Sequence, residues 1–285
     1  MVFIDDKSLA VLNWLGAPFG SEVVVRAAIA GSAVALMCAI VGTWVVLRGS
    51  VFLGDAMSHG MLPGVALASA VGGNLFVGAL IAALAMAYGV AALSRSSRFS
   101  SDTSIGLLLV GMLAVGVIVV SHSSTYAVDL TAFLFGDVLG VRPRDIAVLG
   151  AALAFIAAVA FVGRRAFVAA TFDVRKAATL RLNPRLAAIA LTVLIAVAIV
   201  ASFHVVGTLL VLGLLVAPPA AATLWAHSIG RIMVLAAGIG VVSVWVGLLV
   251  SWHAATAGGA SIAAVAVGMF FCSVIAAAVF QRVTA

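Results

Sequence analysis

Nine apolar stretches follow one another along this chain, each about 20 residues long, which is the length a helix needs to cross the hydrocarbon core of a bilayer. A backbone in lipid must satisfy its own hydrogen bonds, so such stretches predict helices. We therefore expect an all-α polytopic membrane protein with about nine (eight to ten) transmembrane helices. The predicted spans are residues 24–47, 56–73, 75–94, 104–121, 144–163, 185–203, 205–226, 231–252 and 259–281.

The composition excludes the main alternatives to this class. Apolar residues make up 65% of the chain and charged residues only 8%, whereas a soluble domain carries about 25% charged residues. A membrane β-barrel would show alternating segments of about ten residues. The net charge of +6 comes from basic residues scattered between the spans, which is typical of topology determinants and not of a nucleic-acid surface.

We expect a single transmembrane domain over 1–285 that begins with an interfacial segment, 1–22, and the basic residues predict its orientation. The loop 164–185 holds six lysines and arginines, so we expect it in the cytoplasm. That arrangement places 11 of the 15 basic residues inside and 4 outside, with the N-terminus out and the C-terminus in. Residues 122–143 are too polar for an ordinary span, and they either dip into the membrane as a half-helix or cross it and invert the N-terminal half.

The stretch 45–72 carries the most informative polar residues. Asp55, His59 and Pro63 are spaced four apart, so a helix places them along one face. A second stripe with the same spacing consists of small residues, which let another helix approach closely in lipid. This stripe contains Gly60, Gly64, Ala68 and Gly72.

A carboxylate and an imidazole one helical turn apart predict a cation path. Aspartate at the centre of a membrane helix costs roughly 2.5–3.5 kcal/mol unless it faces water, a partner or a cation. One oxygen and one nitrogen ligand suit zinc, manganese or iron(II), and the missing ligands would come from a second copy or from water. Two plainer interpretations remain: Asp55 caps a helix near Met57 and Ser58, or His59 binds a backbone carbonyl.

Other polar or helix-breaking positions are weaker candidates for the pathway or its gate. Pro218 and Pro219 lie inside an apolar stretch, where proline frees backbone carbonyls and breaks or kinks a helix. Broken helices of this kind line cavities in transporters, and His204 falls at the preceding span junction. The remaining candidates are more typical of interfacial or structural positions, and they are His122, Asp129, Asp137, His227 and His253.

The chain lacks the motifs of an ATP-hydrolysing or proteolytic enzyme. Its only lysines are Lys7 and Lys176, and neither lies in a phosphate-binding GxxxxGK[ST] loop. No HExxH or GxSxG pattern occurs. We therefore expect a transport subunit that is not itself an enzyme and binds no cofactor beyond its transported ion. Any ATP and magnesium would be bound and used by a partner subunit.

The middle of the cytoplasmic loop predicts a short helix. Residues 171–182 read TFDVRKAATLRL, with Asp173 as a plausible N-cap and basic residues towards the end. A short amphipathic helix that projects from a membrane protein is either a docking element or a solvated connector. The residues alone favour neither.

The sequence resembles the permease subunits of metal-type ABC importers, which carry zinc, manganese or iron. The resemblance rests on LRGSVFLGDAMSHGMLPGVALA at 47–68 and continues, in order, at 100–121, 129–141, from Phe172 and at 205–222. It implies a type II importer in the bacterial cytoplasmic membrane. Its parts would be two copies of this chain, two ATP-binding-cassette ATPase subunits, and an extracytoplasmic metal-binding protein.

The resemblance also implies roles for individual residues. Asp55 and His59 correspond to the cation-coordinating residues of the GDAxSH pattern, and 172–182 corresponds to the coupling helix that seats in the ATPase. The docking residues would be Phe172, Asp173, Arg175, Lys176, Ala177 and Arg181. Arg181 departs from the family, whose members usually have glycine there, and an arginine could pair with an acidic ATPase surface or shift the exit of the coupling helix.

The residues leave two questions of function open. One carboxylate and one imidazole suit zinc and manganese almost equally. The alternative to an importer subunit is an ion-coupled transporter or scaffold that uses Asp55 and His59 as a proton relay without an ATPase. An associated ATPase subunit would distinguish the two.

Overall fold

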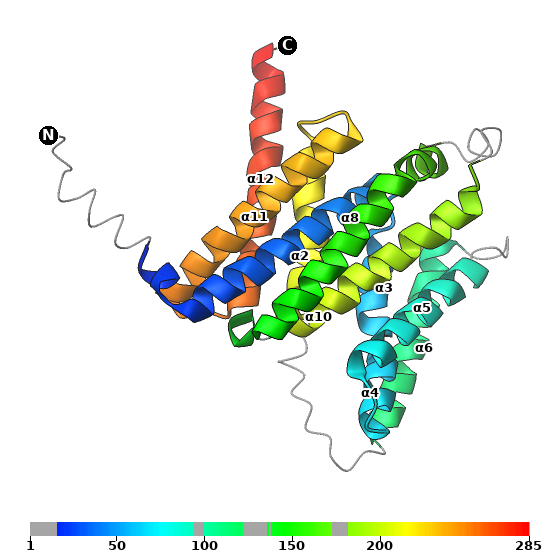
Figure 1. Ribbon diagram of the computed structural model, residues 1–285. Helices are drawn as coiled ribbons and strands as arrows, with labels where there is room; N and C mark the ends of the chain where they lie inside the picture. Colours follow the sequence, from blue (N-terminus) through cyan, green and yellow to red (C-terminus); the bar gives the residue numbers. More distant parts are fainter. Residues whose placement is uncertain (1–15, 94–99, 122–135, 137, 173–181, 285) are drawn as a thin grey trace, which may run out of the picture.

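The computed structural model describes residues 16–93, 100–121, 136, 138–172 and 182–284, and every regular element in these ranges is helical (Figure 1). The prediction of an all-α protein is therefore confirmed. The elements are η1 (Ala17–Gly20), α2 (Glu22–Leu47), α3 (Val51–Gly60), α4 (Leu62–Ala70), α5 (Leu75–Leu93), α6 (Ser101–Ser121), η2 (Val138–Gly140), α8 (Pro143–Phe172), α10 (Pro184–Thr223), α11 (Ile229–Ala254) and α12 (Gly258–Thr284).

In the described ranges, eight helical segments are long and apolar enough to cross a membrane. Two of them, Leu186–Phe203 and Val206–Thr223, are the halves of α10. The predicted span 56–73 is not among the eight, because it is divided between α3 and α4. In Figure 1, α3 begins near the end of α2, and α4 ends where α5 begins, so the pair crosses the bundle as one interrupted span. The predicted number of about nine therefore fits.

Proline and backbone geometry explain the interruption between α3 and α4. Pro63 stands at the start of α4 and has no N–H to donate to the His59 carbonyl one turn earlier. The Met61 N–H instead donates to the Met57 and His59 carbonyls and ends α3. The chain thus continues as a second helix, with the hydrogen-bond pattern interrupted directly after His59.

The break in α10 lies at Gly207, three residues after the junction at His204 that the predicted spans 185–203 and 205–226 imply. Gly207 has φ 74° and ψ 164°, which is outside helical geometry and open essentially only to glycine. Pro218 and Pro219 lie inside the helical segment after this break and are buried. The helix continues through the proline pair without a break.

Packing against α2 explains how the helix accommodates the prolines. Pro219 cannot donate to the Leu215 carbonyl, and that carbonyl lies against Gly42 of α2, where an added Cβ would be only 2.1 Å from the oxygen. The Cys38 thiol donates to the Val211 carbonyl one turn away, at 3.9 Å. Small residues on α2 thus let two backbones meet in the centre of the bundle.

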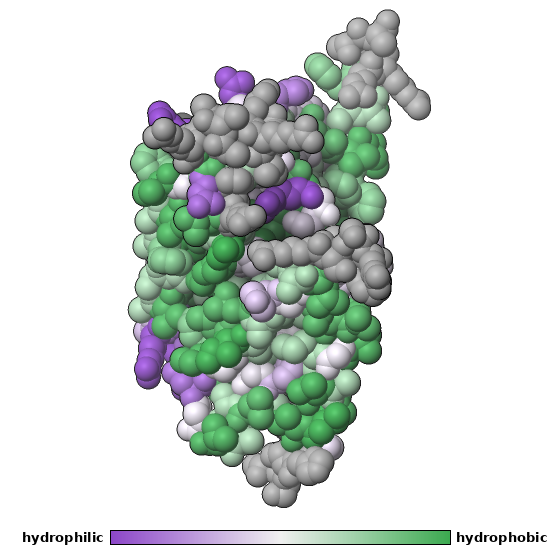
Figure 2. Space-filling view, turned by 90° about the vertical axis from the view of Figure 1, so that its right-hand side faces the viewer, coloured by the Kyte–Doolittle hydropathy of each residue, from purple (hydrophilic) through white to green (hydrophobic). Residues whose placement is uncertain are grey.

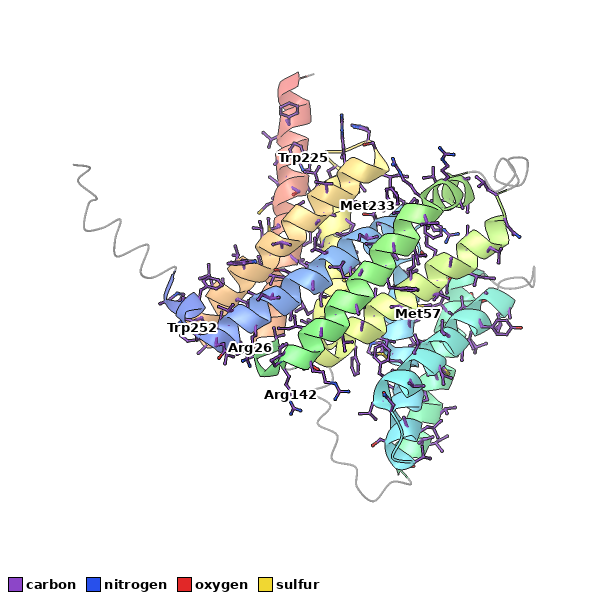
Figure 3. The ribbon with its side chains drawn as sticks, in the orientation of Figure 1. Arg26, Met57, Arg142, Trp225, Met233 and Trp252 are labelled. Atoms are coloured by element: carbon purple, nitrogen blue, oxygen red, sulfur yellow. The ribbon has the colours of Figure 1, made fainter. Side chains whose placement is uncertain are left out.

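The ends of the helices agree with a membrane protein. In Figure 3, Arg26, Arg142 and Trp252 lie towards one end of the bundle and Trp225 lies towards the other. Hydrophobic residues cover most of the face shown in Figure 2. Helix α8 runs to Phe172 and not to 163 as predicted, so Arg164 and Arg165 are exposed helical residues rather than loop residues.

Candidate functional site

Helix α3 brings the two predicted ligands together. His59 Nε2 lies 3.6 Å from Asp55 Oδ1, with the side chains 29% and 40% exposed respectively. This distance is too long for a hydrogen bond, so the two atoms do not occupy each other. A shared cation could bind the Asp55 oxygen and, in the tautomer that leaves Nε2 without a proton, the His59 nitrogen. The spacing of four residues predicted this proximity.

The plainer interpretation of Asp55 is wrong. The N-cap of α3 is Ser50, and Asp55 lies in the second turn of the helix rather than at its start. For His59, no hydrogen bond to a backbone carbonyl is found within the part of the chain that the structure describes. Ser58 occupies such a position instead and donates to the Gly54 carbonyl at 3.0 Å.

The other faces of α3 are covered by neighbouring helices. Ala56 is buried against Met86 and Val90 of α5 and Ile105 of α6. Met57 and Met61 enter the main core (Figure 3 labels Met57). The remaining face carries Phe52, Asp55 and His59, and Phe52 is 67% exposed. The ligand pair thus lies on the side of α3 that the described helices leave open.

The predicted small-residue stripe does pack closely, against α5. An added Cβ on Gly60 would lie 2.9 Å from Met86 Cγ, and one on Gly64 would lie 2.0 Å from the Gly78 carbonyl oxygen. Ala68 approaches Gly78 in the same way. Gly72 is the exception, because it has φ +65° after α4 and nothing lies within 4 Å of an added Cβ. This contact anchors the α3–α4 span behind the ligand pair.

Pro63 does not share the open face of Asp55 and His59. The proline is buried, and its ring lies opposite Gly116 of α6. The interruption at Met61 separates it from α3, which the regular spacing did not reveal. A role for Pro63 in the pathway stays a prediction.

The described residues of one chain supply only part of a metal site. The described ranges contain no group of three or more histidine, cysteine, aspartate or glutamate side chains that could hold an ion. Zinc takes four ligands in proteins, and manganese prefers six. Asp55 and His59 fit such an ion chemically, and further ligands must come from outside this set.

The remaining candidates are dispersed or lie outside the described ranges. His204 is in α10, three residues before Gly207, and His253 is an exposed residue in the last turn of α11. His227 is exposed between these two helices. Phe172 is the last residue of α8. Those outside the described ranges are His122, Asp129, Asp137, Asp173, Arg175, Lys176, Ala177 and Arg181.

Two grooves on the described surface are apolar and do not include Asp55 or His59. The larger, of about 510 Å³, lies between α8 and the start of α10, where Gly163, Phe167 and Leu186 line it. The smaller, of about 280 Å³, lies between α10 and α12 beside Phe270 and Phe271. Asn183 is the one polar side chain among the residues that line these two grooves, so neither groove suits a cation.

Sequence reasoning missed Phe52 as a neighbour of the site. It precedes Asp55 by three residues, which is a same-face spacing, so the signal was present in the sequence. An exposed phenylalanine is unremarkable in a membrane helix, and only the burial of the other sides of α3 singles it out.

Comparison with known proteins gives concordant matches. The model of the ABC 3 transport family matches residues 20–277. The manganese transport system membrane protein MntC of Listeria monocytogenes is 32% identical over 246 residues, which cover 86% of this chain and 88% of the relative. A probable iron transport system membrane protein of Haemophilus influenzae is 31% identical over 252 residues, covering 88% and 93%.

A solved structure shares the fold. PsaBC from Streptococcus pneumoniae in complex with Fab superposes with a TM-score of 0.82 at 28% identity, covering 92% of this chain and 95% of that chain. Family match, relatives and fold agree over nearly the whole sequence. The chain therefore belongs to the ABC 3 transport family and is a multi-pass permease of the bacterial cytoplasmic membrane.

Proposed function

We propose that this chain is the membrane-spanning subunit of an ATP-driven importer that carries a divalent transition metal ion into the cytoplasm. The observation that carries the proposal is the Asp55–His59 pair on the open face of α3. Its oxygen and nitrogen ligands suit manganese, iron(II) or zinc. The names of the relatives, which refer to manganese and iron transport, favour the first two.

A second copy of the chain would complete the ion site. Two copies related by a twofold axis place the same helix face opposite itself, so Asp55 and His59 of each would contribute four side-chain ligands. Water could fill further positions around manganese or iron. This arrangement also covers a carboxylate that would be costly to leave in lipid.

The energy would come from ATPase subunits docked at the end of the bundle where α8 ends and α10 begins. The α2–α3 connection and the facing ends of α5 and α6 lie at the same end (Figure 1). We propose residues 172–182 as the docking segment, with Arg181 facing an acidic ATPase surface. An extracytoplasmic binding protein would deliver the ion at the other end.

Transport by alternating access requires the affinity of the site to change between two states. A ligand shifts a conformational equilibrium only through its differential affinity for the two states. The ion must therefore bind the outward-open arrangement more tightly than the inward-open one. Separation of the two Asp55–His59 pairs as the copies move would lower the number of ligands and release the ion.

We expect Asp55→Ala to abolish ATP-driven uptake of labelled manganese or iron by the complex in proteoliposomes, because each copy loses its anionic ligand. The ATPase subunit should still co-purify with the variant. Asp102→Ala is the matched control, since Asp102 is an exposed aspartate in the first turn of α6, and it should transport normally. Normal uptake by Asp55→Ala would contradict the assignment. Absence of any associated ATPase would favour the proton-relay alternative.

A further inference from the structure

The open face of α3 holds an aromatic side chain beside the two ligands. Phe52 is 67% exposed, against 40% for Asp55 and 29% for His59. At 100° per residue these three positions fall within an arc of about 60° on the helix surface. Gly54, Ala56, Met57, Ser58 and Gly60, on the rest of the helix, are buried.

The order of the three residues along the axis is fixed by the helix. Phe52 lies about 4.5 Å before Asp55, and His59 lies about 6 Å after it, at 1.5 Å per residue. Phe52 is therefore on the side of the Arg48–Gly49 turn, where α2 ends and α3 begins. A cation that leaves the pair towards that end has to pass the ring.

We propose that Phe52 is the gate residue that closes the ion path on the Arg48 side of the Asp55–His59 pair. The inference rests on the proposed function, because it takes the open face of α3 to line the path between two copies. A twofold axis that brings the ligand pairs together also brings the Phe52 rings of the two copies towards each other. Apolar constrictions of this kind exclude water and hydrated ions.

The position of Phe52 distinguishes it from the other exposed phenylalanines. Phe155 and Phe161 lie on α8, a largely exposed span with 11% of its most apolar window buried, as expected for a helix that faces lipid. Phe52 instead adjoins a carboxylate one turn away on a helix whose other faces are packed. Lipid contact alone would leave that carboxylate in hydrocarbon.

The test is a passive leak measurement on the complex with its ATPase in proteoliposomes loaded with a manganese-sensitive dye, without ATP. We expect Phe52→Ala to raise manganese influx down its gradient by about tenfold or more. Phe52→Leu, which keeps apolar bulk, should remain near the wild-type leak. Manganese affinity should be unchanged in both variants, because the ring supplies no ligand.

Phe155→Ala is the matched control, since Phe155 is 49% exposed on α8, and it should leak no more than wild type. If Phe52→Ala leaks no more than wild type, or if Phe155→Ala leaks as much as Phe52→Ala, Phe52 is not the gate. ATP-driven uptake by the wild-type complex would still support the proposed function. Failure of the wild-type complex to accumulate manganese or iron with ATP would instead overturn the proposed function and the gate with it.

Discussion

Gly64 and Gly78 allow α4 and α5 to pack closely because neither has a side chain. An added Cβ on Gly64 would meet the Gly78 oxygen at 2.0 Å and Ala82 Cβ at 2.6 Å, and one on Gly78 would meet the Gly64 oxygen at 2.3 Å. Backbone atoms cannot move aside as the end of a flexible side chain can. The α3–α4 span therefore keeps its position against α5 only with glycine at both sites.

We expect Gly64→Ala to lower the melting temperature of the detergent-solubilised protein, with a destabilisation of about 1–3 kcal/mol from overpacking. Gly111→Ala on α6 serves as the control, because nothing lies within 4 Å of an added Cβ there. Its melting temperature should stay at the wild-type value or rise slightly, since alanine has the higher helix propensity. Equal melting temperatures for Gly64→Ala and wild type would show that α4 and α5 can move apart without a loss of stability.

At the scale of elements, α10 is two spans joined at one residue. Gly207 adopts φ 74° and ψ 164°, and its backbone nitrogen lies so close to Gly136 that a Cβ added there would be 2.3 Å away. Two glycines thus meet where the helix changes direction. The second half of α10 then packs on α2 through Leu215 and Gly42.

We predict that Gly207→Ala lowers the melting temperature more than Pro219→Ala does. Alanine is strained by about 1–3 kcal/mol in the backbone region that Gly207 occupies, whereas replacing Pro219 returns an N–H donor to the helix. Both variants are measured with the exposed Cys272 replaced by serine, by following the reaction of a thiol dye with Cys38, which is buried until the chain unfolds. The reverse ranking would mean that the helix break tolerates a side chain.

At the scale of the whole molecule, the open face of α3 predicts how two chains meet. The described part of one chain contains only a two-residue ligand set, and the face that carries it also exposes Phe52. Of the predicted partners, the second copy is therefore the one for which this surface itself argues. The ATPase and the binding protein follow from family membership and not from this surface.

We expect Phe52→Cys to be cross-linked to its counterpart in the second copy by a short bifunctional thiol reagent, because the proposed twofold axis would pass close to this face. Cys272 is exposed and should first be replaced by serine, while the buried Cys38 can remain. Phe161→Cys is the control, since Phe161 is 81% exposed on α8. A covalent dimer from Phe161→Cys but not from Phe52→Cys on a denaturing gel would place the interface elsewhere.

The sequence predicted much of this architecture because lipid leaves few alternatives. The number of spans follows from the apolar runs. The Asp55–His59 proximity and the packing of Gly60, Gly64 and Ala68 follow from the four-residue spacing. Three features did not follow. The burial of Pro63, the exact residue at which α10 breaks and the placement of Phe52 on an uncovered face depend on which helices become neighbours. A one-dimensional pattern carries little information about those neighbours.

The division of the ligand set has a consequence for biogenesis. If each chain supplies two of the four ligands, a newly inserted chain has no complete ion site until it forms a dimer. Stray permeases in the membrane would then neither sequester scarce nutrient ions nor admit toxic ones. Metal handling would begin only with a finished assembly.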